Sequence, residues 1–249
     1  MYKILAKTLF VGKKVIYLPT CHSTNDVASE LIKKGGAHEG VIVITDNQTA
    51  GKGQRGNTWI AEPGLNLTFS LILKPKFLAA SEQFNLNIAI SLGIHKTLST
   101  GGDGFKVKWP NDIYHRNKKL GGILIQNTIK NNSIEDSIIG IGLNINQTDF
   151  SLPTATSLRL ISDQEYDLNS FLDKLCHNIE SEYLKLKSGK IATLKEDYLE
   201  NLLGYNEERL FRAGQEFRGT ITGVSSTGKL QIQNLFEVRE FDFKEVEFL

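Results

Sequence analysis

A glycine-rich segment between two predicted β-strands restricts the folds that this 249-residue chain can adopt. Residues 49–59, TAGKGQRGNTW, have the spacing G-x-G-x-x-G, which is typical of dinucleotide-binding Rossmann turns and of kinase glycine loops. A Rossmann turn leads from a strand directly into a helix. Here a β-branched strand at 41–45 precedes the glycines, but Pro63-Gly64 and an alternating strand pattern at 65–73 follow them. The context therefore disfavours a Rossmann fold, and a protein kinase is excluded because its VAIK, HRD and DFG motifs are missing.

The remaining pattern of apolar residues predicts an α+β fold. One helix is expected to be capped by Thr24 and closed by Gly35, and a second to be capped by Ser81 and to reach about residue 99. Further helices are expected at 169–188 and 190–203, and further strands at 105–109, 119–129 and 136–146. After Gly204 the sequence alternates between apolar and polar residues, with a turn signal at 226–228. We therefore expect two domains, 1–204 and 205–249, and the second should be a small β-barrel.

The composition limits the classes of protein to which the chain can belong. Hydrophobic residues make up 40% and charged residues 23%, and the formal net charge is +1. There is no basic run of the kind found in nucleic-acid-binding proteins, and no apolar run approaches the roughly 20 residues that cross a bilayer. The first 20 residues lack the pattern of a secretory signal peptide. These observations predict a cytoplasmic protein that binds neither DNA nor membranes.

Two further stretches carry residues suited to an anionic ligand. Residues 106–124, KVKWPNDIYHRNKKLGGIL, place Asp112, which can hold Mg²⁺, close to Lys119, which can meet a phosphate or a carboxylate. In residues 139–146, IGIGLNIN, Asn144 offers both a donor and an acceptor to an adenine-like edge. Lys52 and Arg55 lie among glycines whose amides can approach an anion. Each motif alone is equally compatible with an ordinary turn or a solvated loop tip.

Taken together and in order, the motifs resemble those of biotin–protein ligases of the monofunctional type, which lack an N-terminal DNA-binding domain. The resemblance rests on STND (23–26), the glycine loop, KWPND, KKLGGIL, IGIGLNIN and ATSL (155–158), and so spans nearly the whole chain. It implies a mixed, largely antiparallel sheet flanked by helices, similar to class II synthetases, and a C-terminal SH3-like barrel. It also implies an enzyme that forms biotinyl-5′-AMP from biotin and ATP with Mg²⁺ and then biotinylates a lysine of a biotin carboxyl carrier protein.

The resemblance assigns roles to individual residues. Lys119, Asp112 and Arg55 would be catalytic, with Lys119 bridging the carboxylate and the α-phosphate and Asp112 supporting Mg²⁺. The residues implied in biotin binding are Ser23, Thr24, Asn25, Gln48, Gly51, Lys52, Gly53, Gln54 and Gly122. Those implied in binding ATP or the adenylate are Lys52, Arg55, Trp59, Asn111, Lys119 and Asn144.

One position departs from the family pattern, and two alternative functions stay open. Many members have arginine where this chain has Gln54, so the residue that orders the loop over the adenylate is in doubt. Lipoate and octanoate ligases or transferases share the fold but favour a different glycine-rich arginine motif. A regulatory protein that only binds the adenylate is the other alternative, although repressors of this family add a helix-turn-helix and only 22 residues precede Ser23. A monomer and a homodimer are equally compatible with the sequence.

Overall fold

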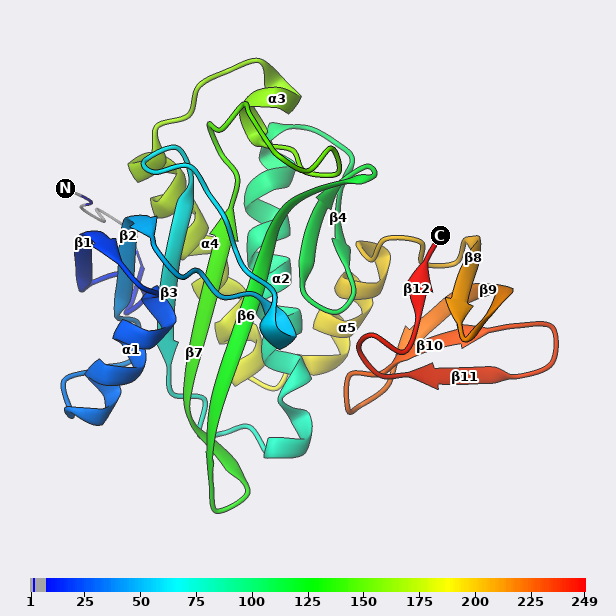
Figure 1. Ribbon diagram of the computed structural model, residues 1–249. Helices are drawn as coiled ribbons and strands as arrows, with labels where there is room; N and C mark the ends of the chain where they lie inside the picture. Colours follow the sequence, from blue (N-terminus) through cyan, green and yellow to red (C-terminus); the bar gives the residue numbers. More distant parts are fainter. Residues whose placement is uncertain (1, 3–7) are drawn as a thin grey trace.

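The computed structural model describes residue 2 and residues 8–249. Its larger part is built on a mixed seven-stranded sheet with the order β1-β2-β3-β7-β6-β5-β4 (Figure 1). The strands are β1 (Val15–Cys21), β2 (Ile42–Gln48), β3 (Leu67–Leu73), β4 (Phe105–Lys108), β5 (Asp112–His115), β6 (Lys118–Lys130) and β7 (Ser133–Leu143). β1 and β2 pair in parallel, and every other neighbouring pair is antiparallel.

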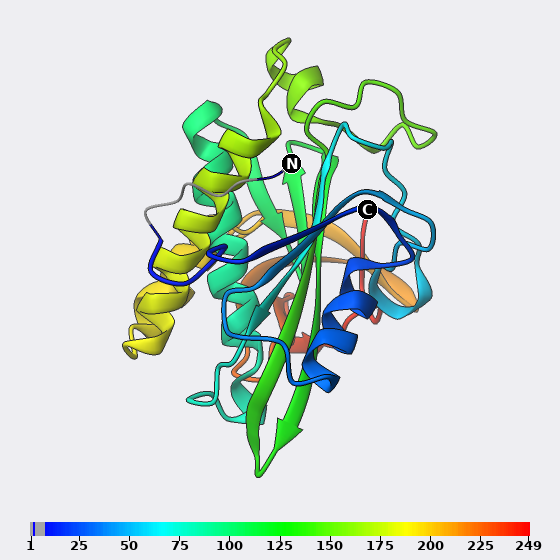
Figure 2. The ribbon, with the colours of Figure 1, turned by 90° about the vertical axis from the view of Figure 1, so that its left-hand side faces the viewer.

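Helices cover both faces of this sheet. α1 (Thr24–Lys33) packs on one face against β2, β3 and β7. The other face carries α2 (Phe84–Leu98), α4 (Leu168–Lys187) and α5 (Ile191–Glu200), and Figure 2 shows the sheet edge-on between the two helix layers. Because β3 lies between both layers, all seven of its residues are buried, including the polar residues Thr68 and Ser70. The expected α+β fold, with a mixed sheet flanked by helices, is confirmed.

Two helix starts differ from the sequence predictions. The cap of α1 is Ser23, whose extended backbone precedes the first turn, so Thr24 and Asn25 lie inside the helix with buried side chains. Ser81 does not cap α2, because residues Ala80–Glu82 form a separate 3₁₀ turn (η2) and the helix begins at Phe84 without a side-chain cap. Three further short elements are the 3₁₀ turns η1 (Gln54–Gly56) and η3 (Ser99–Gly101) and the helix α3 (Leu158–Ser162).

The C-terminal part forms a second, antiparallel sheet beside the main body (Figure 1). Its order is β11-β10-β9-β8-β12, with β8 (Glu208–Ala213), β9 (Gln215–Val224), β10 (Leu230–Gln233), β11 (Val238–Phe241) and β12 (Glu247–Phe248). The predicted turn at 226–228 is confirmed, because β9 ends and β10 begins on either side of it.

The two parts meet at Trp109. Its indole Nε1 donates a hydrogen bond to the Gly228 carbonyl, 2.8 Å away, and its ring packs edge-on against Phe243. Phe243 follows β11, so the C-terminal sheet reaches the main body close to the turn that contains Asn111 and Asp112. None of the described helices is long and apolar enough to cross a membrane.

Candidate functional site

The start of α1, the end of β2, the glycine loop and strands β3, β6 and β7 surround a cavity of about 710 Å³, counted with its open mouth. Phe243 of the C-terminal part also lines it. We call this the ligand cavity. It brings together most of the expected site residues: Ser23, Thr24, Asn25, Gln48, Lys52, Gly53, Gln54, Trp59, Asn111, Asp112, Lys119 and Gly122. Gly51 and Asn144 do not line it, and the side chain of Arg55 lies outside what the structure describes.

Two glycines of β7 make room for two side chains of the cavity wall. A Cβ atom at Gly140 would lie 2.5 Å from Asn25 Oδ1, and one at Gly142 would lie 2.4 Å from the Trp59 indole. Any side chain at these positions would displace Asn25 or Trp59, since real Cβ atoms do not approach other atoms this closely. The glycines of IGIGLNIN therefore allow side chains from two other segments to cross the strand.

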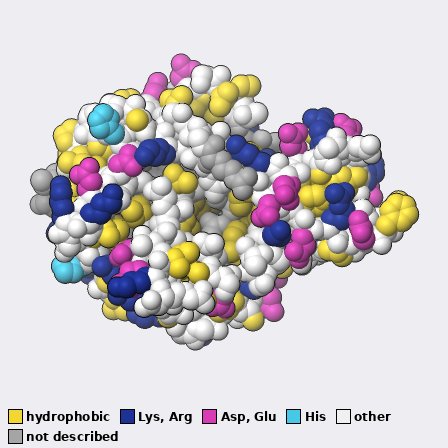
Figure 3. Space-filling model, turned by 60° about the horizontal axis from the view of Figure 1, so that its bottom comes forward, with side chains coloured by type: hydrophobic (Ala, Val, Ile, Leu, Met, Phe, Trp, Pro, Cys, Tyr) yellow, Lys and Arg dark blue, Asp and Glu magenta, His cyan; other side chains and the backbone are white. Residues whose placement is uncertain are grey.

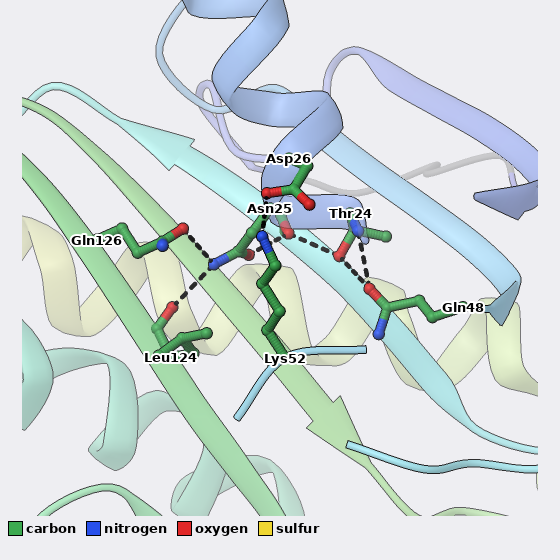
Figure 4. A network of polar contacts seen from close by, with 8 residues as sticks. Thr24, Asn25, Asp26, Gln48, Lys52, Leu124 and Gln126 are labelled. Atoms are coloured by element: carbon green, nitrogen blue, oxygen red, sulfur yellow. Dashed lines mark hydrogen bonds and ion pairs between the residues drawn. The ribbon is translucent and has the colours of Figure 1, made fainter. Parts of the chain in front are cut away.

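The first turn of α1 and the end of β2 form a polar corner of the cavity. Gln48 Oε1 accepts hydrogen bonds from the backbone N–H of Thr24 at 2.8 Å and from its hydroxyl at 3.2 Å (Figure 4). These bonds fix the amide orientation of Gln48, because its oxygen is held by Thr24 and its Nε2 donors are left for other partners. Ser23 beside them makes no capping bond through its side chain.

Behind this corner, Ser70 and Gln126 fix Asn25. The Ser70 hydroxyl, which is fully buried, lies 2.7 Å from Thr24 Oγ1 and 2.6 Å from Asn25 Oδ1. Asn25 Nδ2 donates to Gln126 Oε1 at 2.9 Å and to the Leu124 carbonyl at 3.5 Å (Figure 4). Both ends of the Asn25 amide thus have protein partners, so Asn25 acts chiefly as a support for the corner. Ser70 and Gln126 were not predicted as site residues, because no local motif marks them.

The glycine loop folds back on itself beside the cavity. Gly53 N–H donates to the Asn57 carbonyl at 2.7 Å, and Trp59 N–H donates to the Gly51 carbonyl at 3.0 Å. A Cβ at Gly51 would lie 2.3 Å from the Trp59 carbonyl oxygen, so Gly51 serves the close approach of the two loop strands. Lys52 Nζ lies 2.6 Å from Asp26 Oδ1 and links the loop to α1.

The opposite side of the cavity carries an ion pair. Lys119 Nζ lies 2.7 Å from Asp112 Oδ1, and both side chains are partly exposed toward the cavity. Asp112 and Gly122 are register partners on β5 and β6, and a Cβ at Gly122 would lie 3.3 Å from Asp112 Oδ1. The KKLGGIL segment therefore places a lysine on the cavity wall and leaves space beside its carboxylate partner.

Lys108 adds a further cation close to this pair. It is the register partner of Asp112 on β4, and its Nζ lies 4.8 Å from the centre of the Tyr114 ring. Burial lowers the pKa of Lys108, the charge of Asp112 opposes this effect, and the positive charge of Lys119 reinforces it. Burial also raises the pKa of Tyr114 to about 12. Lys108 was not predicted as a site residue, although it lies in the KVKW segment.

Asn144 does not line the cavity, although Gly142, two residues before it, does. Its Nδ2 donates to the Thr156 carbonyl at 3.0 Å, and its buried Oδ1 accepts no hydrogen bond within the described part of the chain. The buried indole Nε1 of Trp59 likewise has no hydrogen-bond partner there. Buried polar atoms without a partner are uncommon in folded proteins; here Asn144 Oδ1 can accept one further hydrogen bond and Trp59 Nε1 can donate one.

The arrangement suits a ligand that is polar and neutral at one end and anionic at the other. The Thr24–Gln48 corner presents fixed hydrogen-bonding groups, and the ammonium groups of Lys119 and Lys52, each paired with one aspartate, lie at the cavity. Within the described residues no group of three or more His, Cys, Asp or Glu side chains could hold a metal ion. The site can therefore bring an anionic ligand and a phosphate together beside Lys119.

A family model matches the part of the chain that contains the site. The Biotin/lipoate A/B protein ligase family matches residues 17–144, which is just over half of the chain. This range includes the α1 corner, the glycine loop and the Lys119–Asp112 pair.

Individual proteins and a solved structure are also similar to the chain. The bifunctional ligase/repressor BirA of Bacillus spizizenii is 28% identical over 97% of this chain and 76% of its own length. The biotin--[acetyl-CoA-carboxylase] ligase of Mycobacterium tuberculosis is 26% identical over 84% of this chain and 79% of its own length. The biotin protein ligase of Aquifex aeolicus in complex with biotin and ATP superposes with a TM-score of 0.79 and 26% identity, covering 95% of this chain and 99% of that one.

Proposed function

Since the chain belongs to the biotin/lipoate A/B protein ligase family, we propose that it is a biotin–protein ligase. It activates biotin with ATP as biotinyl-5′-AMP and transfers the biotinyl group to a lysine of a biotin carboxyl carrier protein. The similarity to the Bacillus spizizenii ligase/repressor covers 97% of the chain, and the similarity to the Mycobacterium tuberculosis biotin ligase covers 84%. The Aquifex structure with biotin and ATP has the same fold. The observation that carries the proposal is the ligand cavity, which joins a fixed neutral polar corner to Lys119.

The polar corner fits the ureido ring of biotin. A buried ureido group has two N–H donors and a carbonyl acceptor that must all be satisfied. Thr24 and Gln48 hold one another in fixed orientations, so Gln48 Nε2 can donate to the ureido oxygen without reorganisation. Ser23 and the backbone amide of Lys52 would supply further partners, and Asn25 keeps the first turn of α1 in place.

Lys119 fits the activation step. When the biotin carboxylate attacks the α-phosphate, two anions approach one another, and the ammonium group between them stabilises the charge that develops. The bond that forms joins the carboxylate oxygen to the α-phosphorus, and pyrophosphate leaves with the broken bond. Trp59, Asn111 and Asn144 would contact the nucleotide, and Asn144 Oδ1 would gain the hydrogen-bond donor that it lacks. Arg55 stays a proposed loop residue on the strength of its position alone.

Asp112 fits a metal that arrives with the nucleotide. A single carboxylate beside the cavity cannot hold Mg²⁺ alone, but Mg²⁺ is commonly bound by one or two carboxylates together with phosphates. Bound there, the metal would neutralise charge on the triphosphate.

We also propose domain boundaries, a fold relationship and an oligomeric state for the chain. The catalytic domain would span residues 1–204, and the five-stranded sheet after it would be the small SH3-like barrel domain of 205–249. The catalytic domain would be similar to class II synthetases. The chain would act as a monomer or a homodimer.

The proposal is tested by ATP–pyrophosphate exchange with either biotin or lipoate as the acid. Exchange that depends on biotin supports it, because the first step then proceeds without a carrier protein. Exchange with lipoate and none with biotin would transfer the assignment to the lipoate branch of the same family.

A further inference from the structure

A second cavity adjoins the ligand cavity on the side of α2. It measures about 530 Å³ with its open mouth and shares Gln54, Asn111 and Ile123 with the ligand cavity. It continues into a wider hollow of about 770 Å³ where the C-terminal sheet contributes Asp242 and Phe243. Figure 3 shows the surface hollowed between the main body and the C-terminal part, with apolar side chains along it. We call the second cavity the side cavity.

The walls of the side cavity are neutral. Its polar side chains are all amides, namely Gln54, Gln83, Asn87, Asn111 and Asn127. Phe84 and three further apolar residues form the rest, and no charged side chain lines it among the residues that the structure describes. An anionic ligand would find no counter-charge there, whereas a ligand with an apolar stem would find a matching surface.

Three of the amides have an oxygen without a hydrogen bond: Gln54 Oε1, Asn87 Oδ1 and Asn127 Oδ1. The nitrogens of two of them are already engaged, because Asn87 Nδ2 donates to the Pro110 carbonyl and Asn127 Nδ2 donates to Gln83 Oε1. The oxygens are covered by neighbouring atoms, so a ligand reaches them after a rotation of the amide. Such a rotation breaks the Nδ2 bond of Asn87 or Asn127, and a donor that enters the cavity offsets this loss by satisfying the oxygen.

We propose that the side cavity receives the acceptor lysine of the carrier protein. This rests on the proposed function, since it names the entry site for the second substrate. The four methylenes of the lysine lie along Phe84 and the other apolar residues, and the N–H groups of its amine donate to the amide oxygens. Only the shared side chains of Gln54, Asn111 and Ile123 separate this position from the ligand cavity.

The cavity also favours the reactive form of the amine. The lysine ammonium must first release a proton to solvent. Its neutral nitrogen then attacks the biotinyl carbonyl carbon, an amide bond forms as a second proton is released to solvent, the bond from the carbonyl carbon to the AMP phosphate oxygen breaks, and AMP leaves. Neutral walls disfavour an ammonium ion, and so does the positive end of α2, which begins at Phe84. Asp112, which lines the adjoining ligand cavity, is paired with Lys119, and Asp242, which lines the outer hollow, is paired with Lys229.

The test compares Asn127→Lys with Thr128→Lys, using wild-type enzyme as the reference. Both residues lie on β6, and both changes add one positive charge, but Asn127 lines the side cavity whereas Thr128 is exposed and lines none of the cavities described above. Two steps are measured separately: biotin-dependent pyrophosphate exchange without carrier, and biotin transfer to a purified biotin carboxyl carrier domain. We expect exchange to be kept in both variants, and kcat/KM for the carrier domain to fall about tenfold or more in Asn127→Lys only.

Asn127→Asp gives a second readout that a purely structural role would not change. A carboxylate in the cavity binds an ammonium ion more strongly than an amide does, so KM for the carrier domain should fall. It also stabilises the protonated amine, so the rise of kcat with pH should move to higher pH. Equal transfer by Asn127→Lys and Thr128→Lys, or an unchanged KM and pH profile in Asn127→Asp, would overturn the proposal. If the wild-type enzyme shows no biotin-dependent pyrophosphate exchange, the proposed function is overturned, and not only the assignment of the side cavity.

Discussion

Replacing Lys119 with alanine tests the charge assigned to the activation step. Lys119 Nζ lies 2.7 Å from Asp112 Oδ1, and its side chain is 37% exposed. Losing a partly exposed ion pair changes the free energy of unfolding by about 1 kcal/mol or less, which lowers the melting temperature of a chain of this size by about 2–4 °C at most. Losing one preorganised charged donor from a transition state instead costs about 10²–10³ in rate, or roughly 2.7–4 kcal/mol.

The assay is biotin-dependent pyrophosphate exchange, with thermal unfolding measured on the same samples. Lys118→Ala is the matched control, because it removes the same charge from the preceding, exposed position of β6. We expect exchange to fall about 10²–10³-fold in Lys119→Ala and to stay close to the wild-type rate in Lys118→Ala. Exchange by Lys119→Ala within about threefold of wild type, a difference of less than 1 kcal/mol, would refute the assignment.

Three further predictions concern the corner, the N-terminal segment and the loop. Gly140→Ala should weaken biotin binding about tenfold or more, because its Cβ would lie 2.5 Å from Asn25 Oδ1 and displace that support; calorimetric titration measures this. Glu180→Ala should lower the free energy of unfolding by about 2 kcal/mol or more in urea titrations, because three backbone N–H groups of residues 9–11 donate to this buried carboxylate at 2.6–2.9 Å. Gln54→Arg should slow the release of biotinyl-adenylate by adding a charge-assisted contact, measured as less biotin on a bystander protein.

Each of these has a control. Gly101→Ala adds the same methyl group where nothing lies within 4 Å, so it should leave biotin affinity unchanged. Glu180→Gln keeps an acceptor for part of the bonds and should lose less stability than Glu180→Ala. Unchanged biotin affinity in Gly140→Ala, unchanged stability in Glu180→Ala, or equal adenylate release in Gln54→Arg and wild type would each show that the corresponding contact has a different role.

Much of the fold follows from local sequence patterns. The apolar periods at 41–45, 65–73, 119–129 and 169–188 predict elements that the structure contains, with ends shifted by a few residues. The ends of helices differ from the prediction where the N-terminal cap depends on contacts with distant parts of the chain. Ser81 has a cap-like sequence, but the chain forms a 3₁₀ turn there before α2 begins. The short strand β5 follows directly from the turn at Asn111 and was not among the predicted elements.

Some residues of the site were likewise predicted from local motifs, whereas others are recognised only from the fold. Ser23, Thr24 and Lys119 lie in segments with recognisable spacing, and the structure brings them to one cavity. Ser70 and Gln126 contact Asn25 from 45 and 101 residues away along the chain, so only the pairing of β3, β7 and β6 reveals them. The unpaired amide oxygens of the side cavity are equally invisible in the sequence, because they are defined by hydrogen bonds that are absent between distant segments.

The most direct measurement of the central claim is the mass of a biotin carboxyl carrier domain after incubation with this protein, ATP and biotin. The account predicts a gain of one biotinyl group, dependent on ATP, abolished when the acceptor lysine is replaced by arginine, and strongly reduced with the Lys119→Ala enzyme. A carrier domain that stays unmodified under conditions where the protein is folded, or that gains a lipoyl group but no biotin, would contradict the account.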